Sequence, residues 1–301
     1  MKTSHLYLFI CMFTAVILTI ATIGFSPLAQ AGEFIVVEPG VEIYYEEKGE
    51  GPPILFVPGW TFTTEVFGHQ LEQMSTSHRV VVIDPRSQGR STVTLEGNDY
   101  ITHAADLAKV IESLDLRDLV LVGWSFGCLT TYGYVKDKGT DRLKAHVCID
   151  LSPKPLSVQQ GDWVEGPLDE IAAGYHYLRT PAGQREFVAG YADQVMVQRD
   201  ITKAEMFWIV DQSAKSPPWI AAALFASGMF SNHMAEAKLL DESLPALNIV
   251  AEHWADTAVP FLKKHFPNTK TAVLGGHMMF WEHPEKFNAI LNDFIKSIEK
   301  Q

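Results

Sequence analysis

The sequence of 301 residues lacks any run of basic residues, and its formal net charge at pH 7 is −12. Binding to nucleic acid requires clustered lysine and arginine to neutralise the phosphates, so no nucleic-acid partner is expected. Internal repeats and low-complexity tracts are also missing. Charged residues make up 20% of the chain and apolar residues 47%, a balance typical of a globular protein. The length allows one large domain, or one domain with a sizeable insertion.

Cysteine is scarce, with three residues in the whole chain. Cys11 lies in the apolar N-terminal stretch, so Cys128 and Cys148 are the two that an oxidising compartment could pair. A bridge between them needs the intervening helix to lie over the next strand, whereas buried free thiols are commoner. Free thiols are therefore the expectation and a disulfide is the alternative.

Motifs for metal ligands are absent as well. The histidines are scattered, and neither H-E-x-x-H nor paired-cysteine spacing occurs. We expect no metal site and no other cofactor.

The first 31 residues differ in composition from the rest of the chain. Lys2 supplies a positive start, the stretch from Leu6 to Phe25 is almost wholly apolar, and Ala-Gln-Ala at residues 29–31 fits an A-x-A processing site. The pattern predicts a signal peptide over residues 1–31, and hence a periplasmic or secreted protein without stable membrane association. The alternative is an uncleaved membrane anchor, because ~20 apolar residues can cross a bilayer.

Short apolar runs alternate with amphipathic stretches, which predicts a mostly parallel sheet with helices on both faces. The predicted strands are 41–47, 54–57, 80–83, 119–122, 145–149, 247–251 and 271–274. Crossover helices are predicted over 99–114, 126–138 and 284–299. The interval between the fifth and sixth of these runs has many aromatic residues and little strand character. It predicts a helical cap over 152–244, with Pro-rich borders, between core segments 32–151 and 245–301.

The segment DLVLVGWSFGC, residues 118–128, leads from a buried strand straight into Gly-Trp-Ser-Phe-Gly. A strand that turns sharply into a helix presents its turn residue at the carboxyl edge of the sheet, where ligands bind in open α/β folds. Glycine suits positions 123 and 127, because a side chain there would collide with the neighbouring strand or helix. The pattern predicts Ser125 as a nucleophile held in a strained backbone conformation.

A serine hydroxyl is a weak nucleophile unless a nearby base takes its proton. His277 follows the last predicted strand and a pair of glycines, where a loop could aim its imidazole at Ser125, so we predict it as the base. A carboxylate must orient that imidazole. Asp150, directly after strand 145–149, is the preferred acid, with Asp256 as the alternative and Glu252 as a third candidate.

Four motifs carry a resemblance to a known family: VPGW at residues 57–60, DPRSQGRS at 84–91, GWSFG at 123–127, and GH at 276–277 with WEHPE at 281–285. They resemble the H-G-W, D-x-R-G-x-G-x-S, G-x-S-x-G and terminal G-H…W-E-x-P-E motifs of the α/β-hydrolase superfamily. The similarity is to its cap-bearing group of esterases, lactonases, cofactor-free haloperoxidases, epoxide hydrolases and haloalkane dehalogenases. Pro58 and Ser87 depart from the usual histidine and glycine.

The resemblance implies an α/β-hydrolase fold, with a mostly parallel central sheet flanked by helices and a helical cap inserted after the sixth strand. It also implies an oxyanion hole formed by the backbone N–H groups of Trp60 and Phe126. The implied activity is hydrolysis of a small carboxylic ester or lactone, apolar or aromatic because of the aromatic cap. A cofactor-free haloperoxidase or perhydrolase with the same triad is one alternative, and a non-catalytic ligand-binding protein is another.

Overall fold

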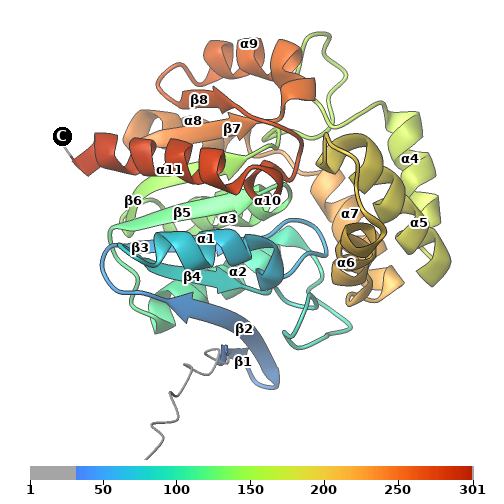
Figure 1. Ribbon diagram of the computed structural model, residues 1–301, viewed down its shortest axis with the longest axis horizontal. Coiled ribbons are helices and arrows are strands. Elements are labelled where there is room, and N and C mark those ends of the chain that lie inside the picture. Colours follow the sequence, from blue (N-terminus) through green and yellow to red (C-terminus); the bar gives the residue numbers. More distant parts are fainter. Residues whose placement is uncertain (1–31, 300–301) are drawn as a thin grey trace, which may run out of the picture. The chain divides into compact units, whose positions relative to one another are not determined.

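The computed structural model describes residues 32–299, and the predicted signal peptide at residues 1–31 lies outside the described residues. An eight-stranded sheet lies at the centre of the described part (Figure 1). Its strands are β1 (Glu33–Glu38), β2 (Val41–Lys48), β3 (Pro53–Val57), β4 (Arg79–Ile83), β5 (Leu119–Trp124), β6 (Leu143–Ile149), β7 (Ala246–Val250) and β8 (Lys270–Val273).

The strands are ordered β1-β2-β4-β3-β5-β6-β7-β8 across the sheet. β1 pairs antiparallel with β2, and β2 pairs antiparallel with β4, whereas every pair from β4 to β8 is parallel. The central strand β5 is buried along its whole length, as expected for a parallel strand covered on both faces. The predicted fold class, a mostly parallel sheet of the α/β-hydrolase type, is confirmed.

Helices cover both faces of the sheet (Figure 1), with α1 and α11 on one face and α2, α3 and α8 on the other. The helical elements are η1 (Thr64–Phe67), α1 (Gly68–Met74), α2 (Tyr100–Ser113), α3 (Gly127–Lys138), α4 (Leu168–Tyr177), α5 (Pro181–Tyr191), η2 (Ala192–Met196), α6 (Lys203–Ala214), α7 (Pro218–Met229), α8 (Met234–Ser243), η3 (Glu252–Trp254), α9 (Ala255–His265), α10 (Met279–Glu282) and α11 (Pro284–Glu299). No helix within residues 32–299 combines the length and the apolar character needed to span a membrane.

Local sequence explains where the crossover helices begin and which face they bury. The Asp99 side chain accepts a hydrogen bond of 2.8 Å from the Thr102 N–H and so caps the first turn of α2. In α11, Phe287, Leu291 and Phe294 recur at helical spacing, and all three are buried. α11 therefore buries one apolar stripe.

The segment between β6 and β7 is helical. It contains α4 to α8, with a π-helical turn, η2, directly after α5. Within it, α8 packs against α3 of the core, whereas α4, α5 and α7 contact one another. Helices α4, α5 and α7 contribute to the wall of the cavity described below.

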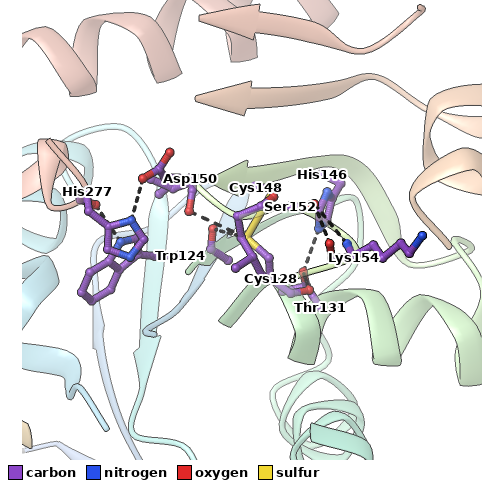
Figure 2. The surroundings of a disulfide bond; sticks show 12 residues. Trp124, Cys128, Thr131, His146, Cys148, Asp150, Ser152, Lys154 and His277 are labelled. Carbon is purple, nitrogen blue, oxygen red and sulfur yellow. Dashed lines mark hydrogen bonds and ion pairs between the residues drawn. A yellow bond between two sulfur atoms is a disulfide. The ribbon is translucent and has the colours of Figure 1, made fainter. Parts of the chain in front are cut away.

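A disulfide joins Cys128 to Cys148 (Figure 2), so the expectation of two free thiols is wrong. Cys128 lies in the first turn of α3, and Cys148 lies on β6, the neighbour of the strand that leads into α3. Their Cα atoms are 5.6 Å apart, within the range that disulfides adopt. The pairing of β5 with β6, together with the start of α3 directly after β5, brings the two residues together, and sequence spacing does not reveal this pairing.

Candidate active site

Ser125 occupies a strained turn at the end of β5. Its φ is 52°, in the left-handed region that residues other than glycine rarely adopt. Two backbone hydrogen bonds of 2.8 Å hold the turn, one from the Ser125 N–H to the Ile149 carbonyl and one from the Cys128 N–H to the Ser125 carbonyl. The turn leaves the Ser125 side chain partly exposed, at the wall of a cavity.

Three glycines make this turn sterically feasible. A Cβ at position 123 would lie 2.7 Å from the Cys128 backbone nitrogen in α3, and one at position 127 would overlap the Val57 carbonyl of β3. A Cβ at position 59 would lie 2.9 Å from the Ser125 Cβ. The expected collisions with the neighbouring helix and strand are thus present for both glycines of the G-x-S-x-G pattern.

Asp150 and His277 form a buried pair, which Figure 2 shows beside the disulfide. Their Oδ2 and Nδ1 atoms are 2.6 Å apart, and each residue is 1% exposed. A carboxylate can only accept, so the imidazole Nδ1–H donates, and Nε2 is left as the acceptor nitrogen. The second oxygen, Oδ1, accepts a hydrogen bond of 2.7 Å from the Ala251 N–H after β7.

The His277 loop is held from two sides. The His277 N–H donates to the Val195 carbonyl of η2 at 3.0 Å, and its carbonyl accepts from the Trp124 indole N–H at 2.8 Å. The rings of Trp124 and His277 have centroids 5.4 Å apart, and the Tyr191 ring is 5.6 Å from the imidazole. The imidazole thus packs against Trp124, the residue directly before Ser125, and against Tyr191, which lines the same cavity as Ser125.

The other candidate acids lie elsewhere. After β7 the chain turns through η3 (Glu252–Trp254), which carries Asp256 into the first turn of α9, where its side chain is exposed. Glu252 is also exposed and accepts a hydrogen bond of 3.3 Å from the Gly275 N–H. Of the three carboxylates, Asp150 is the one that the structure brings to His277, and the alternative Asp256 is not supported.

Trp60 and Phe126 line the cavity together with Ser125. The Trp60 indole N–H donates 2.8 Å to the Ala221 carbonyl of α7, which fixes this side chain against the helical segment. Within residues 32–299, the backbone N–H groups of Trp60 and Phe126 donate no hydrogen bond to a protein acceptor. Two such free donors beside a nucleophile can stabilise an oxyanion.

The DPRSQGRS motif forms hydrogen bonds to the segment that follows Trp60. The Asp84 carboxylate accepts from the Thr64 N–H at 2.6 Å and from the Arg90 N–H at 2.8 Å, and burial raises the pKa of Asp84 to about 6. Ser87, which stands where the resemblance expects glycine, has a φ of 62°, and its backbone carbonyl accepts a 2.8 Å hydrogen bond from the Ser216 hydroxyl. Its side chain, which glycine lacks, accepts a hydrogen bond of 3.1 Å from the Thr94 N–H, so the departure keeps the left-handed turn and adds a contact within the same loop.

The cavity has a volume of about 550 Å³, and aromatic side chains form much of its wall. Tyr177 and Phe225, two aromatic residues of the predicted cap over 152–244, line it. Trp163 is instead fully buried, and Phe207 and Trp219 are exposed. The other aromatic residues of the wall are Trp60, Phe126, Phe187 and Tyr191.

Glu165 and Tyr191 are among the titratable residues of this wall that sequence reasoning missed. The Glu165 carboxylate accepts a hydrogen bond of 3.3 Å from the Ser152 N–H. Burial, together with the nearby charge of Asp150, raises the pKa of Glu165 to about 8, and burial also raises that of Tyr191. Neither residue belongs to a recognisable motif, so no signal in the sequence marks them.

The part of the chain that the structure describes contains no group of three or more His, Cys, Asp or Glu side chains able to hold a metal ion.

Comparison with known proteins gives concordant matches. Residues 52–284 match the family described as alpha/beta hydrolase fold. A putative non-heme chloroperoxidase from Synechocystis sp. is 26% identical over 85% of this chain and 95% of its own length. The non-heme chloroperoxidase CPO-A1 from Kitasatospora aureofaciens is 35% identical over 44% of this chain, and the match spans 48% of that protein.

Among solved structures, an esterase from Exiguobacterium antarcticum superimposes with a TM-score of 0.79. The match covers 88% of this chain and 99% of the esterase at 20% identity. At this identity the likeness shows a shared fold and leaves the substrate open.

Proposed function

Because the chain belongs to the alpha/beta hydrolase fold family, we propose that this hydrolase is a serine enzyme that cleaves a small carboxylic ester or lactone through an acyl-enzyme. The observation that supports it most strongly is the buried contact of 2.6 Å between His277 and Asp150, beside a serine held at a positive φ on the cavity wall. A structural histidine would need neither the carboxylate nor the strained neighbour.

In the proposed mechanism, the Ser125 Oγ attacks the carbonyl carbon while His277 Nε2 takes the hydroxyl proton. Asp150 stabilises the resulting imidazolium through the bond to Nδ1. The N–H groups of Trp60 and Phe126 stabilise the oxyanion of the tetrahedral intermediate. The imidazolium then protonates the leaving alcohol oxygen, and water activated by His277 hydrolyses the acyl-enzyme.

The cavity wall supports an apolar or aromatic substrate. Phe187 lies edge-on to Trp60 with ring centroids 5.9 Å apart, and Phe225 lies 5.8 Å from Phe187. Ile171 and Met229 complete the apolar part of the wall. A pocket lined in this way buries most of the surface of a small ligand.

A panel of esters and lactones of increasing acyl size tests this proposal. We expect turnover with the wild-type protein and none above background with Ser125→Ala. Ser231→Ala changes a serine of the helical segment outside the cavity lining and should keep wild-type rates. Equal turnover by wild type and Ser125→Ala would refute the serine mechanism.

A perhydrolase is the second candidate, because two relatives are named chloroperoxidases. In this reaction hydrogen peroxide replaces water, attacks the acyl-enzyme carbonyl and releases a peracid, and the proton returns to Ser125 through His277. The ratio of peracid to free acid, measured with ester and peroxide together, separates the two candidates. Free acid alone favours the hydrolase.

We also propose a periplasmic or secreted location. The Cys128–Cys148 disulfide supports it, because such bonds persist in oxidising compartments. Fractionation of cells that express the full chain, with N-terminal sequencing of the recovered protein, tests both the location and the predicted cleavage after Ala31.

A further inference from the structure

The cavity wall carries charge of one sign only. Glu165, Glu170 and Glu186 line it, and the lining contains no lysine, arginine or histidine. Glu170 and Glu186 are exposed, so they lie where the cavity meets solvent, whereas Glu165 is mostly buried. None of these three carboxylates has an ion-pair partner among the described residues. An anionic substrate would meet repulsion from Glu170 and Glu186 at the mouth.

Among residues 32–299, no cationic side chain pairs with Glu165, and the Ser152 N–H, at 3.3 Å, is the one hydrogen-bond donor to its carboxylate. The charge of Asp150, which pairs with His277, is near enough to raise the pKa of Glu165 further, and Tyr191 lines the same cavity. The surroundings therefore disfavour its ionised form, which accounts for its raised pKa of about 8. A cation in the cavity would reverse this balance, because an opposite charge nearby favours the ionised carboxylate.

The aromatic residues of the same wall also suit a cation. Phe187 contacts Trp60, Tyr191 and Phe225, with ring centroids 5.8 to 6.3 Å apart. Among the described cation–ring contacts, the protein's own cations lie over Tyr44, Trp281 and Phe294, which are not part of this wall. Ring faces attract alkylammonium groups, and several rings around one site bind quaternary ammonium ions.

We propose that the substrate of this site carries a positively charged nitrogen, as a protonated amine or quaternary ammonium group, a few bonds from its ester or lactone carbonyl. The carbonyl lies at Ser125, and the cationic group lies between Glu165 and the rings of Phe187 and Phe225. This inference rests on the proposed function and narrows its substrate class. The apolar wall binds the alkyl groups of the cation, and the three glutamates supply the opposite charge.

Two matched ester pairs test the inference above pH 8, where Glu165 is ionised. One pair is butyrylcholine and the ester in which carbon replaces its quaternary nitrogen. The other pair is a methyl ester whose acyl chain carries a quaternary ammonium group and the methyl ester in which carbon replaces that nitrogen. In at least one pair we expect kcat/KM for the cationic ester to exceed that of its neutral isostere by about tenfold. Equal values, or a preference for the neutral ester in both pairs, would overturn the inference.

Single substitutions test whether Glu165 is responsible for the preference for cationic esters. Glu165→Gln keeps the shape of the side chain and should remove most of the preference for the cationic ester over its neutral isostere. Asp169→Asn is the matched control, because Asp169 neighbours Glu170 on α4 but does not line the cavity. An unchanged preference in Glu165→Gln would contradict the role given to this residue.

Binding to Ser125→Ala separates this inference from the proposed function. Calorimetry on this variant compares the affinities of the cationic and neutral esters without any turnover. If wild type hydrolyses no ester and yet Ser125→Ala binds the cationic member about tenfold more tightly, the serine mechanism fails and the cation site stands. Equal affinities within both pairs reject the cation site, whether or not esters are cleaved.

Discussion

At the scale of single residues, the candidate site depends on side chains fixed by an unusual backbone. Ser125 and Asp150 both have a positive φ, of 52° and 54°, and each directly follows a strand of the parallel sheet. The Asp150 N–H donates 2.8 Å to the Ile249 carbonyl. Both side chains are thereby turned out of the strand direction and held there, as a nucleophile and an orienting carboxylate require.

The acid can be identified by a paired substitution. Asp150→Asn removes the charge that orients and stabilises the imidazolium of His277, and we expect ester turnover to fall by about 10⁴-fold. Asp256→Asn changes an exposed side chain in the first turn of α9 and should alter turnover little. Steady-state rates of the two variants, with circular dichroism to verify folding, check the prediction. Small and equal losses would contradict the assignment of Asp150.

The raised pKa of Glu165 gives a stability that depends on pH. The carboxyl is neutral in the folded protein up to about pH 8, whereas in the unfolded chain it ionises near its ordinary value of about 4.3. Its favourable contribution is therefore complete below that value and is lost as pH rises towards 8, because the unfolded state alone gains from ionisation.

Melting curves of wild type and Glu165→Gln test this sign. We expect the melting temperature of wild type relative to Glu165→Gln to fall between pH 5 and pH 8, in the interval bounded by the two pKa values. Asp169→Asn, which removes an exposed carboxylate nearby, should show no such trend. A relative melting temperature that rises over this interval would mean that Glu165 is ionised in the folded protein.

At the scale of elements, the sequence predicts most of the sheet. The seven predicted strands correspond to β2–β8 with ends shifted by one or two residues, and the predicted helix 284–299 coincides with α11. β1 was missed. It is an edge strand in which Ile35 and Val37 alone are buried, so its apolar signal is weak and it stands next to the predicted leader. Pairing with β2 stabilises it, and pairing is not visible in a local pattern.

The disulfide links two elements that carry the site. Cys128 follows Ser125 by three residues on α3, and Cys148 precedes Asp150 by two at the end of β6. The crosslink closes a loop with a sequence separation of 20, for which restricted unfolded-state entropy gives about 3 kcal/mol of stabilisation.

We expect the double variant Cys128→Ala/Cys148→Ala to melt several degrees below wild type. Dithiothreitol should lower the melting temperature of wild type and leave that of the double variant unchanged. If the reductant affects neither protein, and wild type alkylates at both cysteines without reduction, the thiols are free.

At the scale of the whole molecule, the fold identifies a family and leaves the chemistry to the site. Proteins named as haloperoxidases and esterases share this architecture with the chain, so a fold match cannot choose a substrate. The charge of the cavity wall is a property of this chain, and it is consistent with the net charge of −12.

Some residues of the candidate site can be predicted from sequence motifs, and others are placed only by tertiary packing. Ser125 and His277 could be proposed from sequence because glycine spacing and position after a strand mark them. The choice of Asp150 over Asp256 depends on how η3 turns away from the sheet. Glu165 enters through a loop of the helical segment, far from any motif. Such choices are made by tertiary packing, which local spacing does not encode.

In the proposed mechanism, His277, oriented by Asp150, activates Ser125 as a nucleophile. Labelling by a fluorophosphonate, with its rate and site followed by intact-protein and peptide mass spectrometry, tests this step most directly. We expect one adduct per chain, located on Ser125, with no adduct in Ser125→Ala and labelling slowed by orders of magnitude in His277→Ala. Labelling of another residue, or an undiminished rate in His277→Ala, would contradict this mechanism.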